Sequence, residues 1–132
     1  SMDSRVFLLK LIPGTQPSVL DYVLANGYRG LVIEAFGLGG LHYIRRNLVE
    51  KLKELRRHGI LILIVTQCMY EKADLSIYEV GNQLLSADVI SGQDMTTEAA
   101  VAKLYYLFSC GYDKEKIKQA MEEDLRGEIS VS

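Results

Sequence analysis

The chain has 132 residues, which is close to the commonest size of a single domain. It carries 15 Lys and Arg residues against 17 Asp and Glu residues, and the formal net charge of -2 gives no electrostatic reason to expect a nucleic acid or a membrane surface as a partner. No apolar run approaches the roughly 20 residues that a membrane-spanning helix needs, and no signal peptide opens the sequence. These features predict one soluble domain over residues 3–132.

The cysteine usage favours a reducing, cytoplasmic setting. Cys68 lies at the end of an apolar run and Cys110 near the end of an expected helix. Two isolated thiols form neither a disulfide framework nor a metal-binding spacing, so we expect no metal and no cofactor. The basic residues between positions 45 and 57 are interleaved with Glu50 and Glu54, which is typical of a solvated helix face.

The first part of the chain alternates between strand and helix patterns. Residues 5–12 (RVFLLKLI) form a short apolar run that ends at a Pro-Gly pair, which predicts a buried strand. A helix is expected to start near Pro17 and to end at the Asn-Gly pair at 26–27, because these residues tolerate the left-handed conformation of a helix end. Residues 30–36 (GLVIEAF) predict a second buried strand.

The longest helix pattern and the most apolar strand pattern follow. An apolar stripe at helical spacing predicts a helix over residues 44–58, which Gly59 would end. The stripe consists of Ile44, Leu48, Leu52 and Leu55. Residues 60–65 (ILILIV) are apolar at every position, which is typical of a parallel strand covered on both faces.

The remaining residues predict one more strand and further helices. Residues 69–77 are expected to be loop, residues 78–86 a short helix, and residues 88–91 (DVIS) a fourth strand. Thr96 is suited to cap the next helix, which we expect to end at Gly111, and Asp113 is suited to cap the last one.

This alternation predicts an α/β fold. A small parallel sheet of about four strands would lie between helical layers, as in Rossmann-like and flavodoxin-like three-layer domains. In open sheets of this type, ligands bind beyond the carboxyl ends of the strands. Those ends are expected at residues 13–14, 34–40, 66–69 and 92–94.

Glu34 is the most unusual residue at this edge, because it interrupts an apolar strand and a buried carboxylate needs a partner. It could bind an ammonium group or order a neighbouring loop, or it could be a purely structural hydrogen-bonding group. Cys68 could be a nucleophile with His42 as its base, but a packed or effector-contacting thiol is the favoured interpretation. The glycine-rich turn at 37–40 lacks the other residues of a nucleotide-binding loop. Taken alone, these residues assemble no catalytic site.

Eight stretches occur in an order that is typical of one known family: KLIPG at 10–14, GYRGLVI at 27–33, FGLG at 36–39, TQCM at 66–69, ISGQDMT at 90–96, EA at 98–99, KL at 103–104 and DLRGE at 124–128. Together they resemble the C-terminal domain of the asparaginase and glutaminase family, and in particular the type I, cytoplasmic L-asparaginases. The resemblance covers almost the whole chain, from near Val6 to near Ile129.

The resemblance implies that the chain is a non-catalytic part of an enzyme. Enzymes of this family carry two catalytic threonines in a larger N-terminal domain, one in a Thr-Gly-Gly-Thr stretch and one in a Thr-Asp pair, and neither motif occurs here. The full-length parent would hydrolyse L-asparagine to L-aspartate and ammonia through attack by a threonine hydroxyl. The present domain would contact its own N-terminal domain and support a homo-oligomer, and it would be inactive alone.

The resemblance also implies two functional regions. An effector site for asparagine would include Glu34, Thr66, Gln67 and Cys68. A loop that approaches a neighbouring active site would comprise Phe36, Gly37, Leu38, Gly39 and Gly40. The chain departs from the family pattern at Glu34, where regulated enzymes have an arginine that binds the effector carboxylate, and at Gly40, where many relatives have asparagine. A glutamate would repel that carboxylate.

Two alternatives follow from these departures. Glu34 followed by the turn at 37–39 also resembles the asparaginase-like subunit of the archaeal amidotransferase that converts glutamyl-tRNA to glutaminyl-tRNA. A non-catalytic effector-binding or dimerisation module is the other alternative. The stretches at 66–69 and 94–99 favour the asparaginase.

Overall fold

The computed structural model describes residues 5–12, 14–35, 46–65, 82–84, 86–92 and 95–131, with side chains up to Glu122. These residues form an α/β domain around a four-stranded parallel sheet with the strand order β1-β2-β3-β4. The predicted fold class is confirmed.

The strands align closely along the sheet. Their bounds are Val6–Lys10 for β1, Gly30–Glu34 for β2, Leu61–Val65 for β3 and Ile90–Ser91 for β4. Gly30 pairs with Val6 on one side and with Leu61 on the other, so the first three strands begin and end level with one another. Every residue of β3 is buried, as its uninterrupted apolar sequence predicts.

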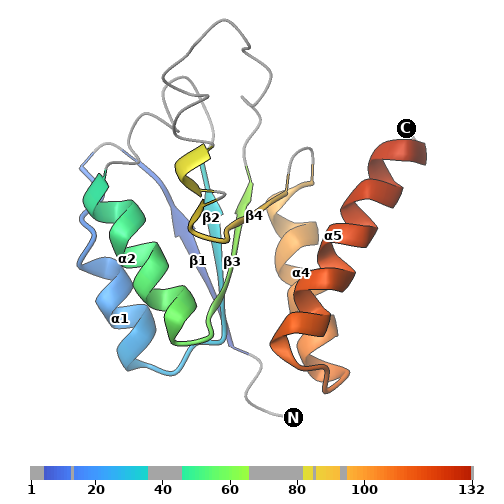
Figure 1. The fold of residues 1–132 in the computed structure, drawn as a ribbon, viewed down its shortest axis with the longest axis horizontal. Coiled ribbons are helices and arrows are strands. Elements are labelled where there is room, and N and C mark those ends of the chain that lie inside the picture. The colour runs from blue at the N-terminus through green and yellow to red at the C-terminus, as the bar shows by residue number, and fades with distance from the viewer. Residues whose placement is uncertain are drawn as a thin grey trace, which may run out of the picture.

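Helices cover both faces of the sheet (Figure 1). Their bounds are Val19–Ala25 for α1, Arg46–Arg57 for α2, Thr97–Ser109 for α4 and Lys114–Val131 for α5. Helices α1 and α2 lie on one face, and α4 and α5 on the other. Within the predicted segment 78–86, residues 82–84 and 86 are helical.

The predicted helix ends are present. The Thr96 side chain accepts a hydrogen bond from the Ala99 N–H at 3.1 Å, and the Asp113 carboxylate accepts one from the Lys116 N–H at 2.8 Å. Gly59 follows α2 with a φ of +84°, a left-handed conformation that suits glycine at a helix end.

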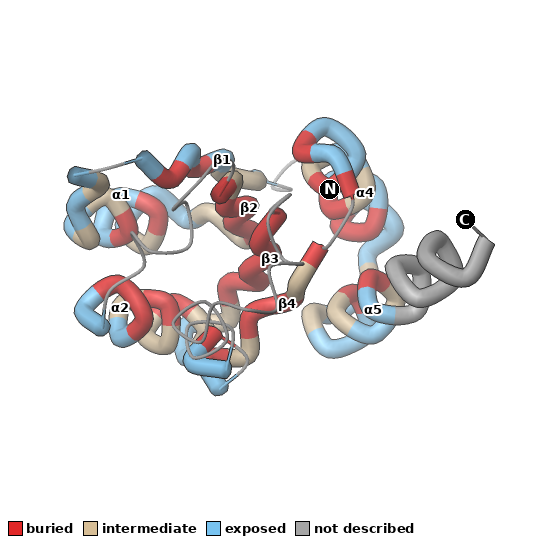
Figure 2. The backbone as a smooth tube through the Cα atoms, turned by 90° about the horizontal axis from the view of Figure 1, so that it is seen from above, coloured by how far each residue is buried: buried red, intermediate tan, exposed pale blue. Residues whose placement is uncertain are grey.

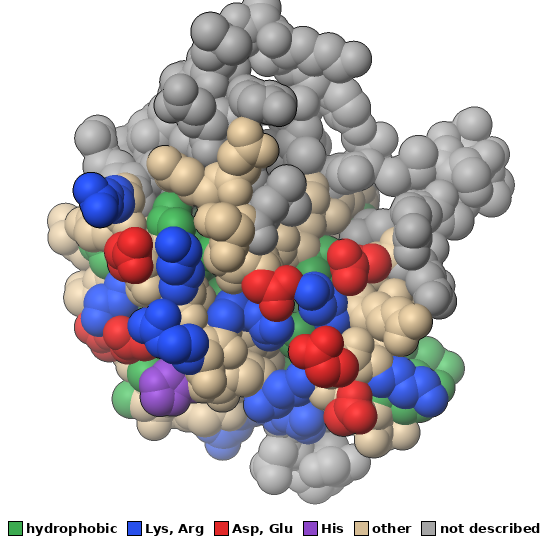
Figure 3. Space-filling model, in the orientation of Figure 1, with side chains coloured by type: hydrophobic (Ala, Val, Ile, Leu, Met, Phe, Trp, Pro, Cys, Tyr) green, Lys and Arg blue, Asp and Glu red, His purple; other side chains and the backbone are tan. Residues whose placement is uncertain are grey.

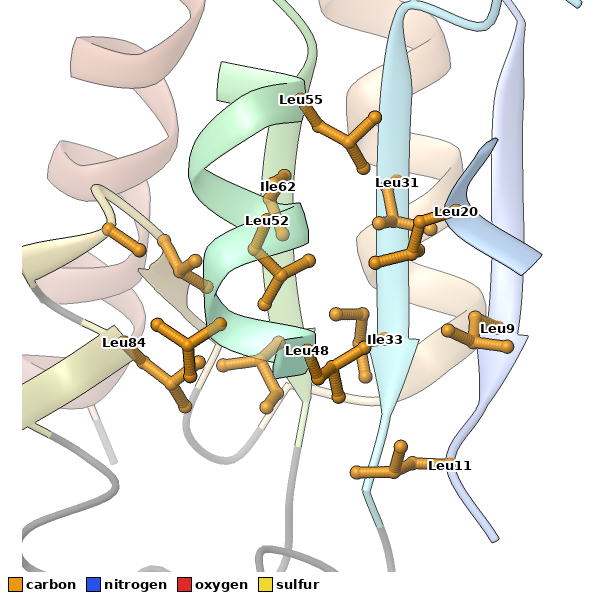
Figure 4. Packing of buried hydrophobic residues seen from close by; sticks show 14 of the residues in the cluster. Leu9, Leu11, Leu20, Leu31, Ile33, Leu48, Leu52, Leu55, Ile62 and Leu84 are labelled. Carbon is orange, nitrogen blue, oxygen red and sulfur yellow. The ribbon is translucent and has the colours of Figure 1, made fainter. Parts of the chain in front are cut away.

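Two apolar clusters form the core, one on each side of the sheet (Figure 2). In the first, Leu52 and Leu55 of α2 point toward Ile62 of β3 and Leu31 of β2 (Figure 4). The second cluster joins α4 and α5 to the opposite face and includes Phe108, which is 1% exposed. A sheet covered on both faces in this way exposes functional groups mainly at its strand ends.

Two predicted strands differ from the observed ones. The first was expected to be buried, but β1 is the edge strand of the described sheet. Leu8 is exposed because, among the described strands, only β2 pairs with β1. The fourth was expected to begin at Asp88, which instead has a φ of +62°, a left-handed conformation that cannot continue a strand. Strand β4 therefore begins at Ile90.

The surface over α2 and α5 mixes basic and acidic side chains (Figure 3). Lys53 and Glu50 of α2 form one ion pair at 3.8 Å, and Lys51 of α2 reaches Asp21 of α1 at 2.7 Å. This mixture agrees with the solvated face predicted for α2. Across the described parts of the chain, no helix is both long enough and apolar enough to cross a membrane.

Candidate functional site

The Glu34 carboxylate at the end of β2 is engaged through both of its oxygens. The Thr97 hydroxyl of α4 donates a hydrogen bond to Oε2 at 2.6 Å, and the Lys10 ammonium of β1 lies 3.5 Å from Oε1. The Glu34 side chain is only 12% exposed, whereas that of Lys10 is 73% exposed. A mostly buried carboxylate thus has the donor that its desolvation requires.

The fold brings these three side chains together from three elements. Lys10 and Glu34 are direct partners in the β1–β2 register, so their side chains emerge on the same face of the sheet. Thr97 is the first residue of α4 and is 4% exposed. The carboxylate therefore lies at the N-terminus of α4, where the helix dipole favours negative charge.

In this geometry, Glu34 links the ends of β1 and β2 to the start of α4. The Thr97 hydroxyl donates to a carboxylate that is paired with Lys10, at the edge of the sheet where ligands bind in folds of this kind. Among the described residues, no three His, Cys, Asp or Glu side chains are grouped closely enough to hold a metal ion.

Comparisons with known proteins identify the family of this domain. Residues 5–121 match the Glutaminase/Asparaginase C-terminal domain family, which is most of the chain. The chain belongs to this family. The predicted resemblance to the C-terminal domain of the asparaginase and glutaminase family is thereby confirmed.

Two curated relatives illustrate the range of the family. An L-asparaginase from Thermococcus kodakarensis is 40% identical over 131 residues, which are 99% of this chain and 39% of that protein. A Glutamyl-tRNA(Gln) amidotransferase subunit from Methanopyrus kandleri is 33% identical over 127 residues, which are 96% of this chain and 27% of that protein. The chain thus spans well under half of the length of these relatives.

A solved structure is similar as well. L-asparaginase I from Vibrio cholerae superposes with a TM-score of 0.69 at 30% sequence identity, over 88% of this chain and 35% of that one. The asparaginase-family fold is therefore shared over nearly the whole length of the described domain.

All of the other residues predicted for the site of this asparaginase-family domain lie outside the described residues. These are Phe36, Gly37, Leu38, Gly39 and Gly40 of the neighbour-site loop, and Thr66, Gln67 and Cys68 of the effector region. Val65, which directly precedes the effector region in the chain, pairs with Glu34 in the sheet. The effector and interface roles of these residues stay predictions.

Two residues of the observed cluster were not singled out from the sequence. Lys10 was noted only within the family stretch 10–14, although aligning the ends of the first two strands would have placed it beside Glu34. Thr97 was noted only within the family stretch 94–99. Its neighbour Thr96 carries the recognisable capping signal, so nothing in the local sequence marked Thr97 as the partner of Glu34.

We expect Thr97→Val to lower the free energy of unfolding by about 1–2 kcal/mol, because it leaves a mostly buried carboxylate without its hydroxyl donor. Thr97→Ser retains the hydroxyl and is the matched control. Urea denaturation of the two variants and the parent sequence measures the difference. Equal losses for the valine and serine variants would show that the hydrogen bond to Glu34 contributes nothing to stability.

Proposed function

We propose that this chain is the C-terminal domain of an L-asparaginase that hydrolyses L-asparagine to L-aspartate and ammonia. The observation that supports this most directly is the 40% identity to an L-asparaginase along 99% of the chain. The structural similarity to a second L-asparaginase agrees with it. The catalytic threonines would lie in an upstream domain of the parent protein.

In this proposal the domain has a supporting role. It stabilises a homo-oligomer, and the loop at 36–40 completes the active site of a neighbouring protomer. Asparagine can act as an effector only if the region of Thr66, Gln67 and Cys68 accommodates it beside Glu34. The exposed free thiol of Cys110 is compatible with the reducing, cytoplasmic location that we propose.

The alternative is the corresponding domain of a Glu-tRNA(Gln) amidotransferase subunit. Several relatives with that name are 31–34% identical over nearly the whole chain. Their lower identity and the match to two L-asparaginases favour the asparaginase. A third possibility, a separate effector-binding or dimerisation module, has no specific observation in its favour.

Ammonia release by the parent protein tests the proposal. We expect the full-length protein to release ammonia from L-asparagine and the 132-residue chain to release none above the buffer blank, because neither catalytic-threonine motif of the family occurs in its sequence. Activity of the isolated chain would contradict the supporting role. Activity of the parent only with glutamyl-tRNA and a partner subunit would establish the alternative.

A further inference from the structure

The outer edge of β1 carries backbone groups that point away from the sheet. On the inner side, the Gly30 N–H donates to the Arg5 carbonyl at 3.1 Å, and the Leu11 N–H donates to the Glu34 carbonyl at 2.8 Å. Backbone groups of a strand alternate in direction. The odd-numbered residues of β1 therefore bond to β2, and the N–H groups of the even-numbered residues point outward.

Helix α4 closes only the beginning of this outer edge. The Val6 N–H donates to the Tyr105 hydroxyl at 3.4 Å, which confirms that the even-numbered groups face outward. The N–H groups of Leu8 and Lys10 lie further along the same edge, in the direction of the strand end. Within the described parts of the chain, they are available to a further segment that runs beside β1.

Large apolar side chains flank this open edge. The Leu8 side chain points to the same face as Val6, on the side of α4, because side chains two residues apart share a face. Leu8 is 48% exposed, Ile12 53% and Tyr105 43%. We call these three residues the β1–α4 patch.

An open apolar edge is unusual in an isolated domain. Natural sheets protect their edges with charges, proline, bulges or a covering segment, because an unprotected edge pairs with other chains. Lys10, whose side chain is 73% exposed, supplies one such charge at the end of β1, whereas Leu8 and Tyr105 add exposed apolar surface beside outward-facing backbone donors. Such a combination is typical of an interface that another part of a protein covers.

The upstream part of the parent protein is the expected occupant of the β1–α4 patch. The match to the C-terminal domain family begins at residue 5, directly before β1, and the relatives extend well beyond the aligned region. An upstream domain would thus be tethered at the start of β1. Because that domain would belong to the same polypeptide, its effective concentration at the β1–α4 patch would exceed that of a free partner.

We propose that the β1–α4 patch is the docking surface for the N-terminal part of the parent polypeptide, and that a segment of that part covers the outer edge of β1. The inference rests on the proposed function in one respect, which is that an upstream domain exists. It does not depend on which reaction that domain catalyses.

Hydrogen–deuterium exchange tests the proposal without any substitution. We expect the amides of Leu8 and Lys10 to exchange at least about tenfold more slowly in the parent protein than in the 132-residue chain, because docking adds acceptors or excludes water. The Leu31 amide of β2, an inner strand of the sheet, is the internal control and should be protected in both. Equal exchange of Leu8 and Lys10 in the two proteins would overturn the proposal.

A pair of charged substitutions gives an independent readout. Leu8→Glu should lower the melting temperature of the parent by about 3 °C or more and change that of the isolated chain much less. Tyr106→Glu is the matched control, because Tyr106 is 66% exposed and lies outside the patch. It should affect both proteins equally. Equal shifts for Leu8→Glu in the two proteins would contradict docking at this surface.

Three further outcomes show whether the docking surface or the proposed function has failed. If protection of Leu8 in the isolated chain rises with protein concentration and light scattering shows a dimer, a second copy occupies the patch and the proposal is wrong. If the parent hydrolyses asparagine but leaves Leu8 unprotected, the docking surface is wrong and the proposed function stands. Protection of Leu8 in a parent without asparaginase activity supports docking and refutes the proposed function.

Discussion

Phe108→Ala is expected to lower the free energy of unfolding by about 3–5 kcal/mol, the range for removing a large aromatic side chain from a packed core. Phe108 is 1% exposed and belongs to the cluster between α4 and the sheet. The Arg29 guanidinium lies 4.7 Å from the centre of its ring. The substitution thus removes apolar contacts and a cation–π contact and leaves a cavity beside β2.

The edge of the same ring explains why glycine occupies position 30. A Cβ atom at Gly30 would lie 3.1 Å from Cε2 of Phe108, which is tighter than ordinary van der Waals contact. Because Phe108 is fully enclosed, its ring has little room to move. We expect Gly30→Ala alone to cost about 1–2 kcal/mol through overpacking.

The double variant makes this explanation testable. In the Phe108→Ala background the ring is absent, so Gly30→Ala should cost nothing and can regain stability by filling part of the cavity. Chemical denaturation of the four proteins gives the coupling energy, expected at about 1–2 kcal/mol. Additive losses would mean that the contact with Phe108 does not constrain position 30.

Regular patterns made much of the fold predictable. The stripe of Leu48, Leu52 and Leu55 is buried against the sheet as its helical spacing predicts. The uninterrupted apolar sequence of β3 correctly indicated a strand covered on both faces. Such features depend on residues that are close together in the sequence, so they can be predicted from one amino-acid sequence.

Features that depend on the order of strands could not be found in this way. The sequence of β1 is as apolar as that of an inner strand, and only the observed order β1-β2-β3-β4 shows that it lies at the edge. The contact between Glu34 and Thr97 joins residues 63 positions apart. No periodicity reports such a contact.

The candidate site was predictable in location and less so in detail. The carboxyl ends of the strands follow from the α/β pattern, and Glu34 was recognisable because a carboxylate is costly within an apolar strand. Its surroundings are a hydroxyl on α4 and an ammonium on β1, which together give it a structural anchor. An effector that approaches this edge would meet a carboxylate whose two oxygens already have partners.

Asp88 illustrates a residue whose importance appears only in three dimensions. Its carboxylate accepts hydrogen bonds from Arg56 of α2 and Lys118 of α5, both at 2.5 Å. Because α2 and α5 lie on opposite faces of the sheet, Asp88 joins the two helical layers beside β4. The sequence indicated it only as the first residue of the predicted fourth strand.

The charges around Asp88 determine how its contribution to stability depends on pH. Partial burial acts to raise the pKa of Asp88, but the hydrogen bonds and charges of Lys118 and Arg56 outweigh burial and hold that pKa below its usual value. The hydrogen bond that Lys118 donates to the Asp88 carboxylate raises the pKa of Lys118. Since the Asp88 pKa is lowered on folding, its contribution is complete above the unfolded value of about 3.9 and is lost as pH falls through the folded pKa.

Asp88→Ala should lower the free energy of unfolding at pH 7 by about 2–4 kcal/mol. Two costs contribute: an alanine at a φ of +62° costs about 1–2 kcal/mol, and the lost ion pairs cost about 1–2 kcal/mol after allowance for the 44% exposure of the Asp88 side chain. Asp88→Asn tolerates the same backbone conformation and loses only the charge. Asp88→Gly loses the side chain but adopts the left-handed backbone conformation without strain.

Denaturation of these variants between pH 3 and pH 8 separates the two costs. The asparagine and glycine variants should both be more stable than the alanine variant at pH 7, since neither combines a strained backbone with the loss of every side-chain contact. The difference in stability between the parent sequence and Asp88→Asn should stay constant from about pH 5 upward and shrink as pH falls toward 3, because the unfolded parent then binds a proton that the folded Asp88 carboxylate resists. A difference that stays the same down to pH 3 would show that the ion pairs at Asp88 do not stabilise the fold, which would leave the backbone conformation as the reason for aspartate at this position.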